Sequence, residues 1–95
     1  MRPGFCQAVA LTGSDQVVSA TPSHLMGVTV RETAGSTAAV RVYDNASAAS
    51  GTILAVVALT ANASQTIDFA VPVRAIAGLY VDIVSGTVEG SVRHG

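Results

Sequence analysis

The sequence predicts an all-β protein: a compact antiparallel β-sandwich of about eight short strands, with a jelly-roll-like or Greek key topology. Three observations predict it. Apolar and polar side chains alternate with a period of two along most of the chain. Clusters of Gly, Asn, Ser and Pro recur about every 8–12 residues, a spacing typical of sandwiches and barrels. No window carries the apolar stripe of an amphipathic helix.

Alternation defines the individual strands. It is clearest in residues 28–31 and 40–44, and again near the C-terminus in residues 79–83. Turn residues separate these runs, because Gly and Asn accept the positive φ that tight turns require. The expected strands span residues 5–12, 16–20, 24–33, 37–44, 52–60, 64–71, 79–84 and 87–93.

A hairpin is expected where a three-residue loop, 34–36, joins two of these strands. Such a loop would place Val30 opposite Val40 and Val28 opposite Val42 on one face of a sheet.

Length and composition predict one domain, residues 1–95, with partners. The chain has 95 residues, of which 49% are hydrophobic and only 12% are charged. A soluble small monomer typically carries about 25–35% ionic side chains on its surface. One interpretation is that partner subunits cover part of an apolar surface. The other is a core of Ala and Val beneath an uncharged surface of Ser, Thr and Ala.

The charge distribution argues against several classes of partner. The net charge is −1, the chain has no Lys, and its five Arg are scattered among acids. Because no basic stripe is present to neutralise phosphates, we expect neither nucleic acid nor an anionic membrane as a partner. The longest apolar run, Ile53–Leu59, has seven residues, far fewer than the ~20 that cross a bilayer.

Targeting signals and disulfides are not expected. Polar residues interrupt residues 2–20, so this segment does not fit a signal peptide. Cys6 is the single cysteine in the sequence, which rules out an intrachain disulfide. We therefore expect synthesis in the cytoplasm.

No pattern in the sequence indicates catalysis, a metal or another cofactor. His24, His94 and Cys6 lack the spacing of metal ligands, and the chain has neither a Gly-x-Ser-x-Gly motif nor a Gly-rich phosphate loop. The carboxylates are expected to be solvated, at outward strand positions or in turns: Asp15, Glu32, Asp44, Asp68, Asp82 and Glu89. We therefore expect no enzymatic activity.

One segment departs from alternation, since residues 53–59 are apolar on both faces. One face would carry Ile53, Ala55, Val57 and Leu59, and the other Leu54, Val56 and Ala58. Two interpretations remain open: the second face is covered by a loop of the same chain, or it is a subunit interface.

Four further residues are candidates for the same interface. Tyr43 and Tyr80 occupy outward strand positions, and Arg31 and Arg41 lie on the polar face of the expected hairpin. Tyrosine is enriched at buried contacts between proteins. The alternative use of outward tyrosines is to stack against sugar rings in a carbohydrate-binding sandwich.

Several segments resemble small virion proteins of tailed bacteriophages. The resemblance lies in the opening Ala-Val-Ala-Leu-Thr run at residues 8–12, in residues 27–35, 40–44 and 50–54, and in the closing segment 78–91. These are strand-and-turn patterns, so they carry no binding residue over to this chain.

The resemblance implies a structural protein of the virion, made in the cytoplasm of the host bacterium. It suggests a capsid decoration or cement protein that forms a homo-oligomer, expected to be a trimer, and binds other virion subunits such as the major capsid protein. The alternatives are a tail or fibre-associated component and a carbohydrate-binding or adhesion module.

Overall fold

Strands make up most of the structure. The computed structural model describes residues 6–95, and this part of the chain contains no helix. The strands are β1 (Gln7–Ala10), β2 (Gln16–Ser19), β3 (Ser23–Glu32), β4 (Ala38–Asp44), β5 (Thr52–Leu59), β6 (Ser64–Ala75), β7 (Leu79–Ser85) and β8 (Val88–His94). Each overlaps the range that alternation predicts, and β6 continues past its predicted end at residue 71. The predicted start of the first strand, residue 5, lies outside the described residues.

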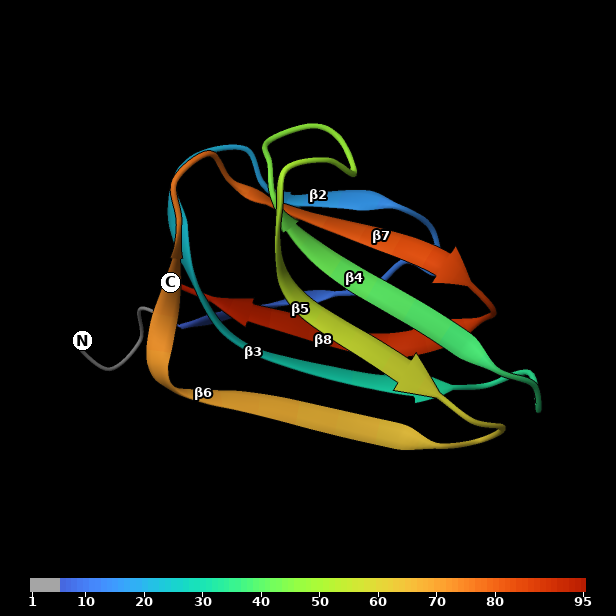
Figure 1. The fold of residues 1–95 in the computed structure, drawn as a ribbon. Coiled ribbons are helices and arrows are strands. Elements are labelled where there is room, and N and C mark those ends of the chain that lie inside the picture. Colours follow the sequence, from blue (N-terminus) through green and yellow to red (C-terminus); the bar gives the residue numbers. More distant parts are fainter. Residues whose placement is uncertain (1–5) are drawn as a thin grey trace.

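The strands form two four-stranded antiparallel sheets, which we name sheet A and sheet B. Sheet A has the order β1-β8-β3-β6 and sheet B the order β2-β7-β4-β5. Between residues 6 and 95, β4 and β5 are the one consecutive pair that lies side by side in a sheet, and every other connection crosses between sheets (Figure 1). This is the order of an eight-stranded jelly roll, a long antiparallel ribbon folded over on itself. The predicted all-β sandwich is confirmed.

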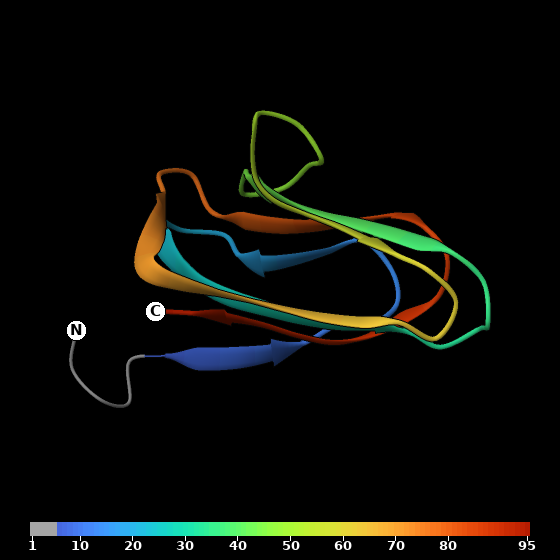
Figure 2. The ribbon, with the colours of Figure 1, turned by 60° about the horizontal axis from the view of Figure 1, so that its bottom comes forward.

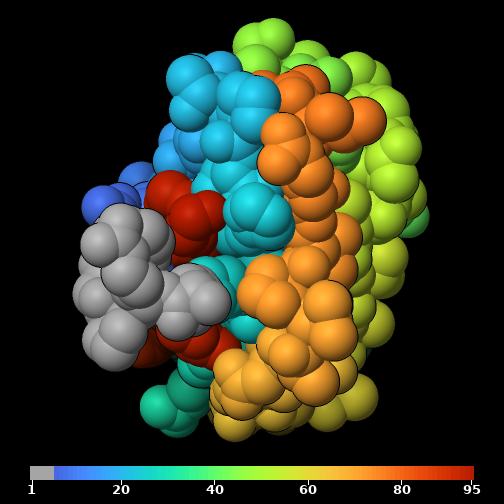
Figure 3. Space-filling view, turned by 90° about the vertical axis from the view of Figure 1, so that its left-hand side faces the viewer, coloured from blue at the N-terminus to red at the C-terminus, as the bar shows by residue number. Residues whose placement is uncertain are grey.

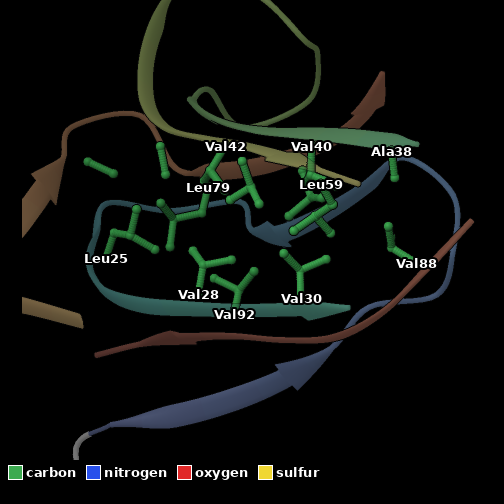
Figure 4. Close-up of a cluster of buried hydrophobic side chains, with 14 residues drawn as sticks. Leu25, Val28, Val30, Ala38, Val40, Val42, Leu59, Leu79, Val88 and Val92 are labelled. Atoms are coloured by element: carbon green, nitrogen blue, oxygen red, sulfur yellow. The ribbon is translucent and has the colours of Figure 1, made fainter. Parts of the chain in front are cut away.

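The core lies between the two sheets, which Figure 2 shows as separate layers. The inward side chains of each sheet point toward those of the other (Figure 4). The valine and leucine side chains that are at most 1% exposed are Leu25, Val28, Val30, Val40, Val42, Val57, Leu79, Val81 and Val92. Burying each such side chain stabilises the fold by about 1.5–3 kcal/mol, so aliphatic residues hold the sandwich together in a chain without Trp.

The hairpin predicted around residues 34–36 is wrong. β3 pairs with β6 and β8 in sheet A, whereas β4 pairs with β5 and β7 in sheet B. The loop between them crosses from one sheet to the other. Val30 and Val40 are both buried, as alternation requires, but they enter the core from opposite sheets.

Candidate functional site

The outer face of sheet B gathers most of the residues predicted to form an interface. Residues directly opposite each other on antiparallel neighbours point to the same face. One row of opposed residues crosses all four strands: Val17 of β2, Tyr80 of β7, Tyr43 of β4 and Ile53 of β5. Val81, the neighbour of Tyr80, is fully buried, so this row points away from the core.

Two more rows lie beside the first. Asp82 lies opposite Arg41, and Arg41 lies opposite Val56. Ala39 lies opposite Ala58. Together the three rows form what we name the sheet-B outer face: Val17, Ala39, Arg41, Tyr43, Ile53, Val56, Ala58, Tyr80 and Asp82.

The exposed apolar side chains concentrate on this side of the molecule. Six large apolar side chains of residues 6–95 are exposed. Three belong to the sheet-B outer face: Val17 at 45%, Ile53 at 43% and Val56 at 57%. A fourth, Val84, lies in β7 of the same sheet. The other two lie outside sheet B: Val71, 79% exposed, in β6, and Ile76, 72% exposed, just after β6. The face therefore leaves branched aliphatic side chains in contact with solvent.

The paired rows on the outer face of sheet A are more polar. They are Ala8, Arg93, Gly27 and Asp68, then Ala10, Ser91, Thr29 and Thr66, then Glu89, Arg31 and Ser64. Arg93 donates to Asp68 Oδ1 at 2.8 Å and to Thr29 Oγ1 at 2.9 Å. A Cβ at Gly27 would lie 2.5 Å from Arg93 Nη2, so glycine lets the arginine cross β3. The predicted interface residue Arg31 lies on this face, on the opposite side of the sandwich from the others.

Leu54 was predicted to share a face with Val56 and Ala58, and this prediction is wrong. The pairing of β4 with β5 shifts beyond Val42, which lies opposite Ala55. A β-bulge of this kind inserts one residue, so the faces reverse beyond it. Leu54 is the inserted residue, and it is partly buried and packs against the core. Ile53, expected in the core, is exposed for the same reason.

Tyr43 occupies an outward strand position as predicted, but its ring is largely covered. Its position opposite Tyr80 places it on the outer side of sheet B, yet only 8% of its surface is accessible. Tyr80 is partly exposed. The outer face of sheet B therefore offers one accessible aromatic ring instead of two.

Asp82 and Arg41 are the charged members of this otherwise apolar face. Burial raises the pKa of Asp82, and the negative charge of Asp15 and a hydrogen bond with its carboxyl group raise it further, while Arg41 lowers it. Asp15 is held against β7 because its Oδ1 accepts a hydrogen bond from the Ile83 N–H at 2.8 Å.

Glu32 was predicted to be a solvated carboxylate, and this prediction is wrong. The side chain is fully buried at the end of β3. Its oxygens accept hydrogen bonds from the N–H groups of Ala34, Gly35 and Ser36, and from that of Asn62 in the turn after β5, at 2.7 to 3.1 Å. The bond from Asn62 and the three others lower the pKa of Glu32, although burial opposes them. Glu32 thus joins two loops.

Asp44 does the same at the other end of the sandwich. Its oxygens accept from the N–H groups of Ile76, Ala77 and Gly78 at 3.1, 2.8 and 3.4 Å. These bonds, that from Ala77 first, lower the pKa of Asp44 against the effect of burial. Glu32 and Asp44 both accept hydrogen bonds from backbone N–H groups of loops. The sequences of these loops carry no pattern that would identify the carboxylate partner, so the sequence did not predict this role.

The remaining candidates for chemistry are dispersed. In the part of the chain that the structure describes, no group of three or more His, Cys, Asp or Glu residues could hold a metal ion. Cys6 is exposed. His94 Nδ1 shares a hydrogen bond with Ser23 Oγ at 3.0 Å, a contact that fastens the end of β8 to β3. None of the described residues belongs to a helix that could cross a membrane.

No protein-family model, curated protein or solved structure matches this chain. The resemblance to virion proteins of tailed bacteriophages stays a prediction from the sequence.

Proposed function

We propose that this chain is a structural virion protein of a tailed bacteriophage, a capsid decoration or cement protein that self-associates and binds the capsid surface. The binding part of the proposal depends on one observation: the paired rows on the two outer faces of the sandwich differ, those of sheet A being mainly polar and those of sheet B mainly apolar. The virion part depends on the sequence resemblance. Jelly rolls occur among viral capsid proteins, lectins and cupins, so the fold is compatible with the proposal without selecting it.

The sheet-B outer face is suited to bind another protein. Val17, Ile53 and Val56 are about half exposed, so complete burial of each would recover roughly half of the ~1.5–3 kcal/mol assigned to such a side chain. Arg41 and Asp82 add charged groups that favour a partner carrying the opposite charges at the facing positions. We infer that this face contacts the major capsid protein.

The carbohydrate-binding alternative is less well supported. Sugar sites generally present exposed aromatic rings, and this chain contains no Trp. Since Tyr43 is 8% exposed, Tyr80 is the aromatic residue left for stacking on this face. The apolar surface around it is better matched by a protein partner.

The direct test is to look for the chain in purified phage particles by mass spectrometry, after separating heads from tails. The proposal expects the chain in the head fraction in many copies. Its presence in tails alone would favour the tail or fibre-associated alternative. Its absence from particles, together with specific binding on a glycan array, would favour the adhesion module.

A further inference from the structure

The four edge strands of the sandwich differ in how they are protected. The edges of the two sheets are β1, β6, β2 and β5. Exposed edges invite pairing with other chains, and proteins usually block them with short strands, charges, Pro or bulges. β1 and β2 have four residues each. β6 carries Asp68 and Arg74, and its pairing with β3 is irregular around Pro72. Three of the edges are therefore blocked.

β5 lacks these protective features over residues 55–59, where its pairing with β4 is regular. Residues 55–59 contain no charge, no Pro and no Gly, and they lie beyond the bulge at Leu54. The strand forms a margin of the molecule beside β6, seen in yellow-green next to orange in Figure 3. Its backbone groups on the side away from β4 have no partner strand in sheet B.

We propose that β5 pairs antiparallel with β5 of a second copy of this chain, about a two-fold axis at Val57, so that two copies of sheet B form one continuous eight-stranded sheet. Residues 55–59 are alternately buried and exposed, and this pattern reads the same in both directions from Val57. A two-fold axis there places core-facing residues beside core-facing residues and outward residues beside outward ones. An edge that matches itself in this way favours a second copy over an unrelated strand.

The sizes of the side chains agree with the same axis. Ala55 would lie opposite Leu59 of the second copy, and Val56 opposite its Ala58, so Leu59 and Val56 each meet an alanine. Val57 would lie opposite its own copy. Cross-strand neighbours of matching shape are the unit of sheet stabilisation, and the uncharged edge brings no like charges together.

This inference deepens the proposed function, because it names a contact for self-association. It favours a two-fold dimer over the trimer expected from the sequence, since an edge that pairs with itself closes after two copies. The sheet-B outer face would then continue across both copies and double the surface available to a capsid partner.

The first test measures the mass of the purified chain by analytical ultracentrifugation over a concentration series. We expect a dimer for the wild type and a folded monomer for Val56→Asp, because a charge on the edge blocks pairing. The matched control is Val17→Asp, which places the same charge on the same face in β2 and should leave the dimer intact. Circular dichroism verifies that both variants are folded.

The second test reads the register with cysteines in a Cys6→Ser background, since Cys6 is exposed. Directly opposed residues have Cα atoms about 4.5–5.5 Å apart, within the range that a disulfide spans. We expect a mixture of Val56→Cys and Ala58→Cys chains to form a cross-linked heterodimer under mild oxidation, while Val56→Cys alone forms little.

A monomeric wild type, or a Val56→Asp variant that dimerises like the wild type, would overturn the proposed pairing. Efficient cross-linking of Val56→Cys to itself would overturn the axis at Val57. None of these results bears on capsid binding, because each is measured without particles. The virion proposal fails separately if the chain is absent from purified phage.

Discussion

Glu32 connects loops that are far apart in the sequence, and its replacement should therefore weaken one end of the sandwich. Glu32→Ala would leave the N–H groups of residues 34–36 and of Asn62 without their buried acceptor. We expect its thermal denaturation midpoint to fall by several degrees. Glu89→Ala, which removes an exposed carboxylate in β8, should change the midpoint little. Equal midpoints for the two variants would show that Glu32 does not hold the loops.

The hydrogen bonds of Glu32 and Asp44 should make the stability of the fold decrease in acid. The pKa values of Glu32 and Asp44 lie below their ordinary values of 4.5 and 3.8, so the unfolded chain takes up these protons first as pH falls. Their stabilising effect is complete at neutral pH and is lost as pH drops below about 4.5 and then through the lowered pKa values. Denaturation midpoints measured across pH should be level near neutrality and decrease in acid. Glu32→Gln should flatten the acid decrease, and an unchanged slope in that variant would contradict this origin.

Asp82 has the opposite effect. Its pKa is raised, mainly by burial and then by Asp15, so its charged form destabilises the folded chain at neutral pH. We expect Asp82→Asn to raise the denaturation midpoint slightly at pH 7, and the gain to shrink in acid, where the wild-type carboxyl group is protonated. The control is Asp68→Asn, which breaks the exposed ion pair with Arg93 and should give no gain. A midpoint lowered by Asp82→Asn would mean that the charged form is stabilised, by Arg41 for example.

At the scale of the element, alternation located the strands but not their neighbours. Each predicted strand overlaps an observed one, because the buried face of a strand leaves a period of two in the sequence. The partner of β3 could not be read in this way. The side chains of residues 28–32 show which face is buried, and this is the same whether β4 lies beside β3 or across the core from it.

The bulge at Leu54 could not be predicted from the sequence either. Residues 53–59 are all apolar, so a reversal of faces at one residue leaves no mark in the pattern. Val56 and Ala58 share one exposed face, as alternation predicts, because they lie on the regular side of the bulge. Glu32 was missed because its partners include Asn62, a backbone contact between loops that the side-chain pattern does not record.

Neighbouring valines of β5 should respond differently to the same charge. Val57 is 1% exposed and Val56 is 57% exposed. An unpaired charge in the core costs several kcal/mol, a large part of the about 5–15 kcal/mol that stabilises a typical domain. We expect Val57→Asp to be unfolded by circular dichroism at room temperature and Val56→Asp to be folded. If Val56→Asp also unfolds, its side chain is needed inside the fold and the assignment of this face to solvent is wrong.

At the scale of the whole molecule, the two outer faces have divided roles. Sheet A presents Arg31, Glu89 and the Arg93–Asp68 ion pair to solvent, which suits an exposed surface. Sheet B presents Val17, Ile53 and Val56, which suits a covered one. If the proposed assembly covers sheet B, the low charge content of the chain is explained, because only one of the two broad faces then has to remain soluble.

The central claim, that the sheet-B outer face binds the particle, is tested most directly by one co-sedimentation experiment with phage particles lacking this protein. The two chains to compare are Val17→Asp, on the sheet-B outer face and away from β5, and Thr66→Asp, on the outer face of sheet A. We expect Val17→Asp to be folded and to remain in the supernatant, and Thr66→Asp to sediment with the particles like the wild type. Sedimentation of Val17→Asp at the wild-type level, or loss of binding by Thr66→Asp alone, would contradict the account.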